Sequence, residues 1–420
     1  MKYLSRFLMV AFVAAGFALP AAAQSQQRIQ IKWLTLDWNS DEFKKQFEAD
    51  NPGYELVTEN LPFNNLFQQA QIRLGAKSDS FDVLSVDVPL TAGYGLRRWL
   101  EPLDDAFTAA EKNDWLDASR AAGTYKGKLI SAPISTSTQL LFYNKDLLKA
   151  AGIPFPKTNE RLTYEAVAEL AKKVVKATPS VSGFTWEQTV RIYQLGQLAA
   201  SLGGKMIAND GLTVKGVIDS PQWLKAFTFY QSIFKNNLGP LSDTIPAADL
   251  FKAGKIGFLV GGPWNIPQLN DAKVGFQWGI SRTPYFKEGV PATPTGSWHI
   301  GVNPNSKNKQ AAKLFVHYIS TGKGAEYWWR IGSGDMPAVK SVLNLFKTDP
   351  QFDREPLIFM RTAADEATVN PVPRAVSPGY LEYEQNLQNT FQDIRTGTDV
   401  KQALDQAVTR ISAEMNKYSR

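Results

Sequence analysis

Hydrophobic and polar residues alternate around position 30 and then follow a helical spacing. Ile29, Ile31 and Trp33 occupy alternate positions, as in a β-strand. Phe43 and Phe47 lie four residues apart, on one face of a helix that we expect Ser40 to cap. The same spacings predict a strand over 54–58, a helix over 65–74 and a strand over 81–86. Alternating strands and helices predict an α/β fold with a mainly parallel sheet covered by helices.

The three predicted strands each end in side chains that suit ligand binding. The first strand leads to Trp38, the second to Asn64 beside an aromatic residue, and the third to Asp87. The carboxyl ends of parallel strands share one edge of a sheet, where open α/β sheets bind ligands. We therefore take Trp38, Asn64 and Asp87 as candidate binding residues. The alternative for each residue alone is a helix cap or a turn.

The second half of the chain shows a further set of helices and strands. Residues 134–139 are polar and β-branched, which predicts an extended crossing between two lobes. Residues 180–298 then carry tryptophans in predicted loops, at positions 186, 264 and 298. Aromatic rings beside amides and carboxylates suit a ligand with both C–H faces and hydroxyls, which describes a sugar or a polyol.

The stretch Leu250–Asn265 is the most informative of these segments. An apolar strand over 256–260 is broken by Gly261-Gly262-Pro263, and Trp264 follows. A single tryptophan after a turn is more often a core residue. Taken with the other strand ends, however, Trp264 is predicted to stack on a ligand. Covering one face of an indole, on the order of 80 Å², contributes about 2 kcal/mol to binding.

A proline-rich segment over 371–380 contains Arg374. Its planar guanidinium fits a pair of hydroxyls or an acidic group, so Arg374 is a candidate binding residue. The equal alternative is a salt bridge that closes this loop.

The chain begins with features of a secretory signal peptide. Lys2 and Arg6 precede an apolar run over 7–19, and Ala21-Ala22-Ala23 forms a cleavage site, so residues 1–23 are expected to be removed. The alternative is an N-terminal anchor. Removal of Lys2 and Arg6 with this segment takes the formal net charge from +6 to +4 (+6 − 2). The chain has no cysteine and therefore no lipobox, which predicts a protein free in the periplasm.

The composition excludes several kinds of chemistry. A chain of 420 residues with no cysteine and two histidines has no cysteine nucleophile and no histidine-rich metal site. His299 lies beside Trp298 and is placed to touch a ligand, whereas His317 is expected to be structural. We predict no cofactor, no metal and, because basic residues are scattered, no nucleic-acid partner. Acidic residues leave an exported glycoside hydrolase as the enzymatic alternative, since that chemistry needs two carboxylates.

Several segments, in order, resemble the family 1 extracellular solute-binding proteins of ABC importers, the group that includes maltose-binding and other sugar-binding proteins. The matching segments are Phe81-Asp82-Val83 with Asp87, Trp99–Asp104, Tyr125–Lys128 through Ala132-Pro133, Phe142–Asp146, Phe251–Lys255 through Gly262-Pro263-Trp264, and Met336-Pro337-Ala338. Each is weak alone, but their shared order is specific. The chain departs from the family pattern at Asn159, at 257–258 and at 296–298, so the resemblance does not specify the ligand.

The resemblance implies a two-lobed periplasmic binding protein-like type II fold, with mixed sheets flanked by helices and a hinge between the lobes. The N-terminal lobe would comprise residues 24–138 and 299–347, and the C-terminal lobe residues 139–298 and 348–420. The implied crossings lie at 137–139, at 298–301 and near 345–350. Ser137, Trp186 and Trp298 join Asp87 and Trp264 as implied ligand contacts.

The function implied is that of a non-enzymatic binding component. A carbohydrate or polyol would be captured between the lobes, which close by a hinge motion, and delivered to permease subunits in the inner membrane. A monomer is the expected state. A non-sugar or phosphorylated solute remains the alternative within binding proteins.

Overall fold

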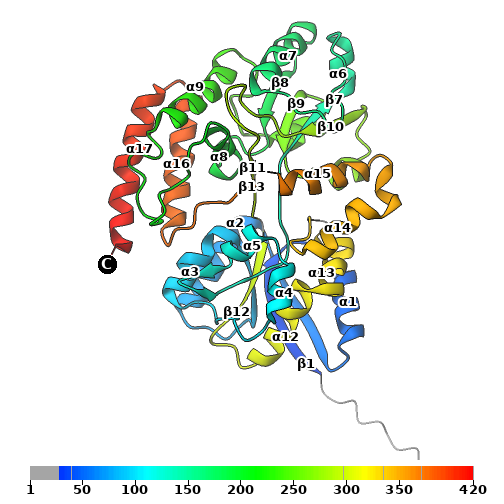
Figure 1. The fold of residues 1–420 in the computed structure, drawn as a ribbon, viewed down its shortest axis with the longest axis vertical. Coiled ribbons are helices and arrows are strands. Elements are labelled where there is room, and N and C mark those ends of the chain that lie inside the picture. Colours follow the sequence, from blue (N-terminus) through cyan, green and yellow to red (C-terminus); the bar gives the residue numbers. More distant parts are fainter. Residues whose placement is uncertain (1–27, 39, 297, 334, 370, 420) are drawn as a thin grey trace, which may run out of the picture.

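The structure is a computed structural model that describes residues 28–38, 40–296, 298–333, 335–369 and 371–419 (Figure 1). The predicted signal peptide, residues 1–23, lies outside the described residues. Within these ranges, no helix combines the length and apolar character needed to cross a membrane.

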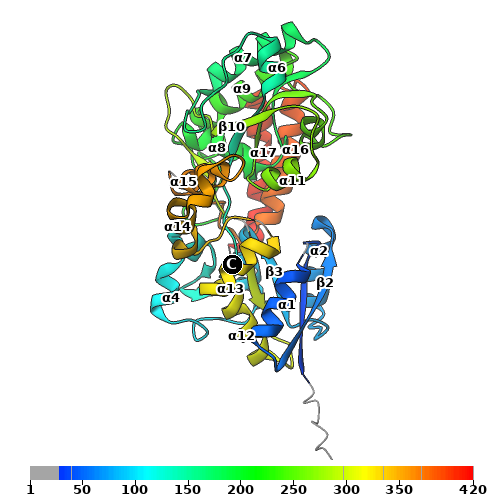
Figure 2. The ribbon, with the colours of Figure 1, turned by 90° about the vertical axis from the view of Figure 1, so that its right-hand side faces the viewer.

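The chain builds two separate bodies, each around its own sheet (Figures 1 and 2). The first sheet has five strands in the order β2-β1-β3-β12-β6. Strand β1 pairs in parallel with β2 and β3, and β12 pairs antiparallel with β3 and β6. The strands are β1 (Ile29–Leu36), β2 (Tyr54–Leu61), β3 (Val83–Asp87), β6 (Ala132–Pro133) and β12 (Trp298–Val302).

Helices and a short hairpin surround this sheet in the lower body of Figure 1. They are α1 (Asp41–Asp50), α2 (Phe63–Gly75), α3 (Thr91–Arg97), α4 (Ala109–Asp114), α5 (Asp117–Ala122), α12 (Lys309–Ser320) and α13 (Gly322–Trp328), with β4 (Thr124–Tyr125) and β5 (Lys128–Leu129). Trp33 lies at the centre of the core, with its ring edge-on to Phe315 at 5.2 Å and to Trp328 at 5.4 Å between centroids.

The second sheet has four strands in the order β10-β7-β9-β8. Only β8 and β9 are parallel; β7 runs antiparallel to β9 and β10. These strands are β7 (Leu140–Asn144), β8 (Ser182–Trp186), β9 (Ile256–Gly261) and β10 (Trp278–Arg282). The upper body also contains α6 (Lys145–Ala150), α7 (Tyr164–Ala177), α8 (Ile192–Ser201), α9 (Pro221–Lys235), α10 (Ala247–Lys252), α11 (Asn265–Asp271), α15 (Ile358–Thr368), α16 (Tyr380–Arg395) and α17 (Val400–Met415). The predicted α/β class with two lobes and mixed sheets is confirmed.

Local sequence signals account for several element ends. Thr163 Oγ1 accepts from the backbone N–H of Ala166 at 3.1 Å and caps α7, and Gly254, at φ +72°, makes the predicted turn before β9. Ser40 occupies the N-cap of α1 but makes no side-chain capping bond, so that expectation was wrong in its chemistry. Helix α2 begins at Phe63, two residues before the predicted start, because Pro62 sets the extended backbone that precedes it.

Three crossings join the bodies. Residues 134–139 connect β6 to β7, and the N–H of Thr136 donates to the carbonyl of Met336 at 2.7 Å. A second crossing leads from β11 (Thr293–Pro294) to β12, and a third link joins α14 (Lys340–Thr348) to α15. Strand β11 pairs in parallel with β13 (Pro371–Val372), which precedes α16. The exact lobe boundaries given above stay a prediction.

Candidate ligand-binding cleft

A cavity of about 620 Å³ lies between the two bodies. Its volume falls within the range of about 300–1,000 Å³ that is typical of small-molecule sites. The lining residues come from both bodies: Leu36, Trp38, Phe63, Asp87, Gln188, Arg191, Tyr193, Trp264, Pro267, Gln268, Asp271, Trp298, Gly332, Ser333, Asp335 and Arg374. We call this space the main cavity.

Aromatic rings form the side of the main cavity that belongs to the first sheet. Trp38 follows β1 and lies edge-on to Trp298, with 5.5 Å between centroids and 90° between planes. Trp298 begins β12 and is in register with Asp87, the last residue of β3. Phe63 lies edge-on to Trp298 at 6.0 Å. Three strand ends thus meet at one edge of the sheet, as the sequence pattern predicted.

Trp264 lies on the opposite side of the main cavity, in the turn between β9 and α11. Its indole folds back over Gly262, where a Cβ atom would lie 2.1 Å from the ring. Its Nε1 donates to Glu187 Oε1 at 2.8 Å, and the N–H of Gly262 donates to Glu187 Oε2 at 3.1 Å. The orientation of the indole is therefore fixed by one carboxylate and by the absence of a side chain at position 262.

Glu187 directly follows β8 and is enclosed by hydrogen-bond donors. Besides Trp264 and Gly262, Gln194 Nε2 donates to it at 3.2 Å. Burial raises the pKa of Glu187, and the donated hydrogen bonds oppose that rise only in part.

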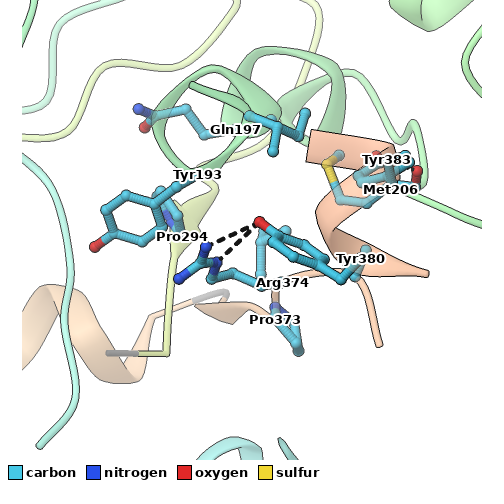
Figure 3. Close-up of a pocket in the computed structure, with 12 residues that line it drawn as sticks. Tyr193, Gln197, Met206, Pro294, Pro373, Arg374, Tyr380 and Tyr383 are labelled. Atoms are coloured by element: carbon cyan, nitrogen blue, oxygen red, sulfur yellow. Dashed lines mark hydrogen bonds between the residues drawn. The ribbon is translucent and has the colours of Figure 1, made fainter. Parts of the chain in front are cut away.

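An ion pair links the two bodies across the cleft. Arg374, in the loop between β13 and α16, donates from Nη1 to Asp87 Oδ1. Its Nη2 also donates to Tyr380 Oη at 2.9 Å, and Figure 3 shows the Arg374 side chain between Tyr193 and Tyr380. The guanidinium carbon lies 5.1 Å from the centroid of the Tyr193 ring and 5.2 Å from that of Tyr380.

A second ion pair lies next to the first. Arg191 Nη2 and Glu384 Oε1 are 2.8 Å apart, and Arg374 Nη2 lies 3.6 Å from the same oxygen. Burial alone would raise the pKa of Glu384, but Arg191 and Arg374 outweigh it and hold this pKa below its usual range. Burial raises the pKa of Asp87, with Arg374 and Arg191 opposing the rise. The four charges sum to zero, so the cluster as a whole is neutral.

Five of the eight candidate residues line the main cavity: Trp38, Asp87, Trp264, Trp298 and Arg374. Arg374 forms a salt bridge, but with Asp87 of the other body instead of the loop-closing partner that the alternative expected. Ser137 is buried behind the cavity, where its Oγ accepts from Tyr193 Oη at 2.6 Å, so it supports a lining residue instead of lining the cleft. Asn64 lies in α2, and its side chain is outside the part of the chain that the structure describes.

Trp186 does not reach the cleft, which corrects its placement there. Its side chain is 0% exposed and packs in the core of the upper body, 4.6 Å from the Phe184 ring and 5.6 Å from the Tyr230 ring. Trp186 is the last residue of β8, and its side chain faces the helices behind the sheet. Successive residues of an extended chain point to opposite faces, so the next residue, Glu187, points the other way and binds Trp264.

Neither histidine lies at the cleft. His299 is fully buried, and its Nδ1 is 2.9 Å from Ser131 Oγ. Burial lowers the pKa of His299 to about 3, so the ring is neutral. His317 Nε2 lies 2.8 Å from Glu111 Oε1 on the surface. Across the described residues, no group of three histidine, cysteine, aspartate or glutamate side chains is arranged to hold a metal ion.

Sequence reasoning missed Glu187, Arg191, Tyr193 and Glu384. Glu187 directly follows β8, a strand that the sequence analysis did not predict, so the strand-end rule that selected Asp87 was not applied to it. The other three lie on α8, just before it, or on α16, and no sequence signal distinguishes them from ordinary helix residues.

Comparisons with known proteins agree with the two-lobed α/β fold. A family described as bacterial extracellular solute-binding protein matches residues 39–326. The maltotriose-binding protein of Pyrococcus abyssi is 25% identical over 319 residues, covering 75% of this chain and 66% of that protein. The mannitol-binding protein of Pseudomonas aeruginosa is 24% identical over 326 residues, covering 73% of this chain and 72% of that protein.

A solved structure shares the fold over nearly the whole chain. The ABC substrate-binding protein of Listeria monocytogenes in complex with cycloalternan superposes with a TM-score of 0.81. It is 22% identical and covers 93% of this chain and 100% of that protein.

Proposed function

This chain belongs to the bacterial extracellular solute-binding protein family, and from that premise we propose that it captures a carbohydrate or polyol in the cleft between its lobes. We propose further that it delivers this ligand to an ABC transporter permease in the inner membrane. Relatives that bind maltotriose and mannitol support a ligand rich in hydroxyls.

The observation that carries the proposal is the pair of aromatic surfaces that face one cavity. Trp38 and Trp298 lie on one side and Trp264 on the other. A sugar ring presents C–H faces to such surfaces, and each indole face covered contributes about 2 kcal/mol. Two or three such contacts with hydrogen bonds to hydroxyls approach the roughly 8 kcal/mol that micromolar affinity requires.

The charges of the cleft favour a neutral ligand over a phosphorylated one. Each of the two arginines that line the main cavity already has a carboxylate partner, Asp87 for Arg374 and Glu384 for Arg191. A phosphate would have to break one of these pairs and leave a buried carboxylate without its counter-charge, which is costly.

The remaining parts of the proposal concern where the protein acts and in what form. The signal peptide expected over residues 1–23, in a sequence without cysteine, supports a location in the periplasm. We propose a monomer without catalytic activity, whose lobes close on the ligand by movement at the crossings.

A ligand screen tests the proposal. Purified protein is heated with a panel of mono-, di- and trisaccharides and polyols, and the melting temperature is recorded. A bound ligand at 100 times its Kd stabilises the folded state by about 2.7 kcal/mol, so at least one compound should raise the melting temperature. No shift across the panel would contradict a carbohydrate or polyol ligand.

A further inference from the structure

A second cavity, of about 470 Å³, continues the cleft beyond the main cavity. It lies between α2 and α16, which belong to different bodies, and is lined by Phe67 on α2 and by Gln385 and Gln388 on α16. We call it the side cavity. Its volume also falls in the range of about 300–1,000 Å³ that small-molecule sites occupy.

The two cavities meet at a shared set of lining residues, namely Phe63, Asp87, Gln188 and Arg191. The guanidinium of Arg191 lies over the ring of Phe63, with 5.0 Å from its carbon to the centroid. Phe63 belongs to one body and Arg191 to the other. The contact between their side chains therefore separates the main cavity from the side cavity. Arg191, which is also paired with Glu384 at 2.8 Å, therefore stands at the boundary between the two cavities.

The side cavity has the chemistry of a sugar subsite. The Phe63 and Phe67 rings, 4.7 Å apart and edge-on, offer apolar surfaces, and the glutamines at 188, 385 and 388 offer amide donors and acceptors. Gln188 Oε1 is buried at the junction with no hydrogen-bond partner among the described residues. A buried acceptor without a donor is costly, and a ligand hydroxyl would satisfy it.

We propose that the side cavity binds the extension of a neutral oligosaccharide that is too long for the main cavity, and that Arg191 is the movable divider between the two. The proposal rests on the proposed function. Short ligands occupy the main cavity alone. Longer ligands shift the Arg191 guanidinium away from Phe63 while its ion pair with Glu384 is kept, pass Gln188 and gain contacts with Phe67 and Gln388.

Affinity measured against ligand length tests this proposal. Malto-, cello-, manno- and xylo-oligosaccharides, from mono- to pentasaccharide, are titrated by calorimetry into the wild-type protein. At least one series should gain about tenfold or more in affinity between its shortest and longer members, which corresponds to about 1.4 kcal/mol. Gln388→Trp fills the side cavity from an exposed helix position. It should remove this gain and leave the affinity for the shortest binding member within about twofold.

Gln392→Trp is the matched control. Gln392 is the same residue type on the same helix, one turn later, is exposed, and lines neither cavity. It should behave as the wild type, and melting curves of both variants verify that they fold. Affinity that does not rise with length, or a gain that survives Gln388→Trp, would overturn the side-cavity proposal. Binding of monosaccharides or polyols alone would leave the proposed function standing, whereas no binding by any saccharide or polyol would overturn both.

Discussion

Asp87 and Arg374 are separated by 287 positions in the sequence, yet they form an ion pair that joins the two bodies of the molecule. Asp87 ends β3 in the first sheet, and Arg374 follows β13 beside α16. Both side chains are 7% exposed. The pair therefore lies in the cleft wall and holds one body against the other.

Removing one charge of this pair should destabilise the protein strongly. In Asp87→Asn the guanidinium of Arg374 keeps its charge but loses its buried counter-ion, which costs about 3 kcal/mol or more. Unfolding in urea measures the loss as a change in the free energy of unfolding. The matched control is Asp105→Asn, whose partner Lys313 is 2.7 Å away and whose own side chain is 73% exposed. It should cost about 1 kcal/mol or less, and equal losses in the two variants would contradict a special role for the buried pair.

Truncating Trp264 should weaken ligand binding without unfolding the protein. Trp264→Ala removes a ring that lines the main cavity, and the loss of about 2 kcal/mol of apolar contact predicts an affinity at least about tenfold lower. Calorimetric titration with the ligand found in the screen measures the effect. Trp278→Ala is the control, because Trp278 packs on Phe359 at 5.1 Å and lines neither cavity. Unchanged affinity in Trp264→Ala would contradict the claim that the ligand stacks on this indole.

Gly262 should tolerate no side chain, since the indole of Trp264 lies directly over it. A Cβ at position 262 would lie 2.1 Å from ring atoms of Trp264, so Gly262→Ala should displace the indole and lower ligand affinity about tenfold or more. Tryptophan emission and calorimetry report the two effects. Gly53→Ala, where a Cβ would meet nothing within 4 Å, is the control. A Gly262→Ala protein that binds normally would show that the indole position is not what the ligand requires.

The strand-end rule explains part of the outcome of the sequence analysis. It selected Trp38 and Asp87, and the structure places both in the lining of the main cavity because parallel strands deliver their ends to one edge. Trp186 was a contact implied by the family resemblance, and the structure shows it as a strand residue in the core, one position before Glu187. Sequence alone does not show which way the last residue of this strand faces, because residues 183–186 of β8 are buried on both faces of the sheet.

No local sequence pattern predicts the cluster of Asp87, Arg374, Arg191 and Glu384. Arg191 and Glu384 are 193 positions apart and meet only because α8 and α16 pack together. For Arg374, composition permitted both a ligand clamp and a salt bridge, and only the position of Asp87 in the folded chain distinguishes the two. Propensity and spacing predict elements well, whereas such long-range pairs depend on the tertiary arrangement.

The raised pKa of Glu187 predicts a specific dependence of stability on pH. A carboxyl whose pKa is higher in the folded protein binds more protons when folded, so its contribution to stability falls as pH rises from the usual glutamate range through the raised value. Glu187→Gln removes this loss and should gain stability relative to the wild type as pH increases. Unfolding in urea across a pH series measures the difference.

Glu59→Gln should show the opposite trend. A hydrogen bond from Arg73 holds the pKa of Glu59 below its usual range, so the wild-type residue stabilises the fold above that range and the variant loses stability relative to the wild type as pH increases. Parallel trends in the two variants would contradict the assignment of a raised pKa to Glu187.

The most direct test of the account is a crystal structure of the protein with the saccharide or polyol that raises its melting temperature most. We predict that the ligand lies in the main cavity, with a C–H face against the indole of Trp264 and its other side toward Trp38 and Trp298. A ligand bound elsewhere, or bound in the cleft without contact to Trp264, would contradict the central claim that these aromatic surfaces capture it.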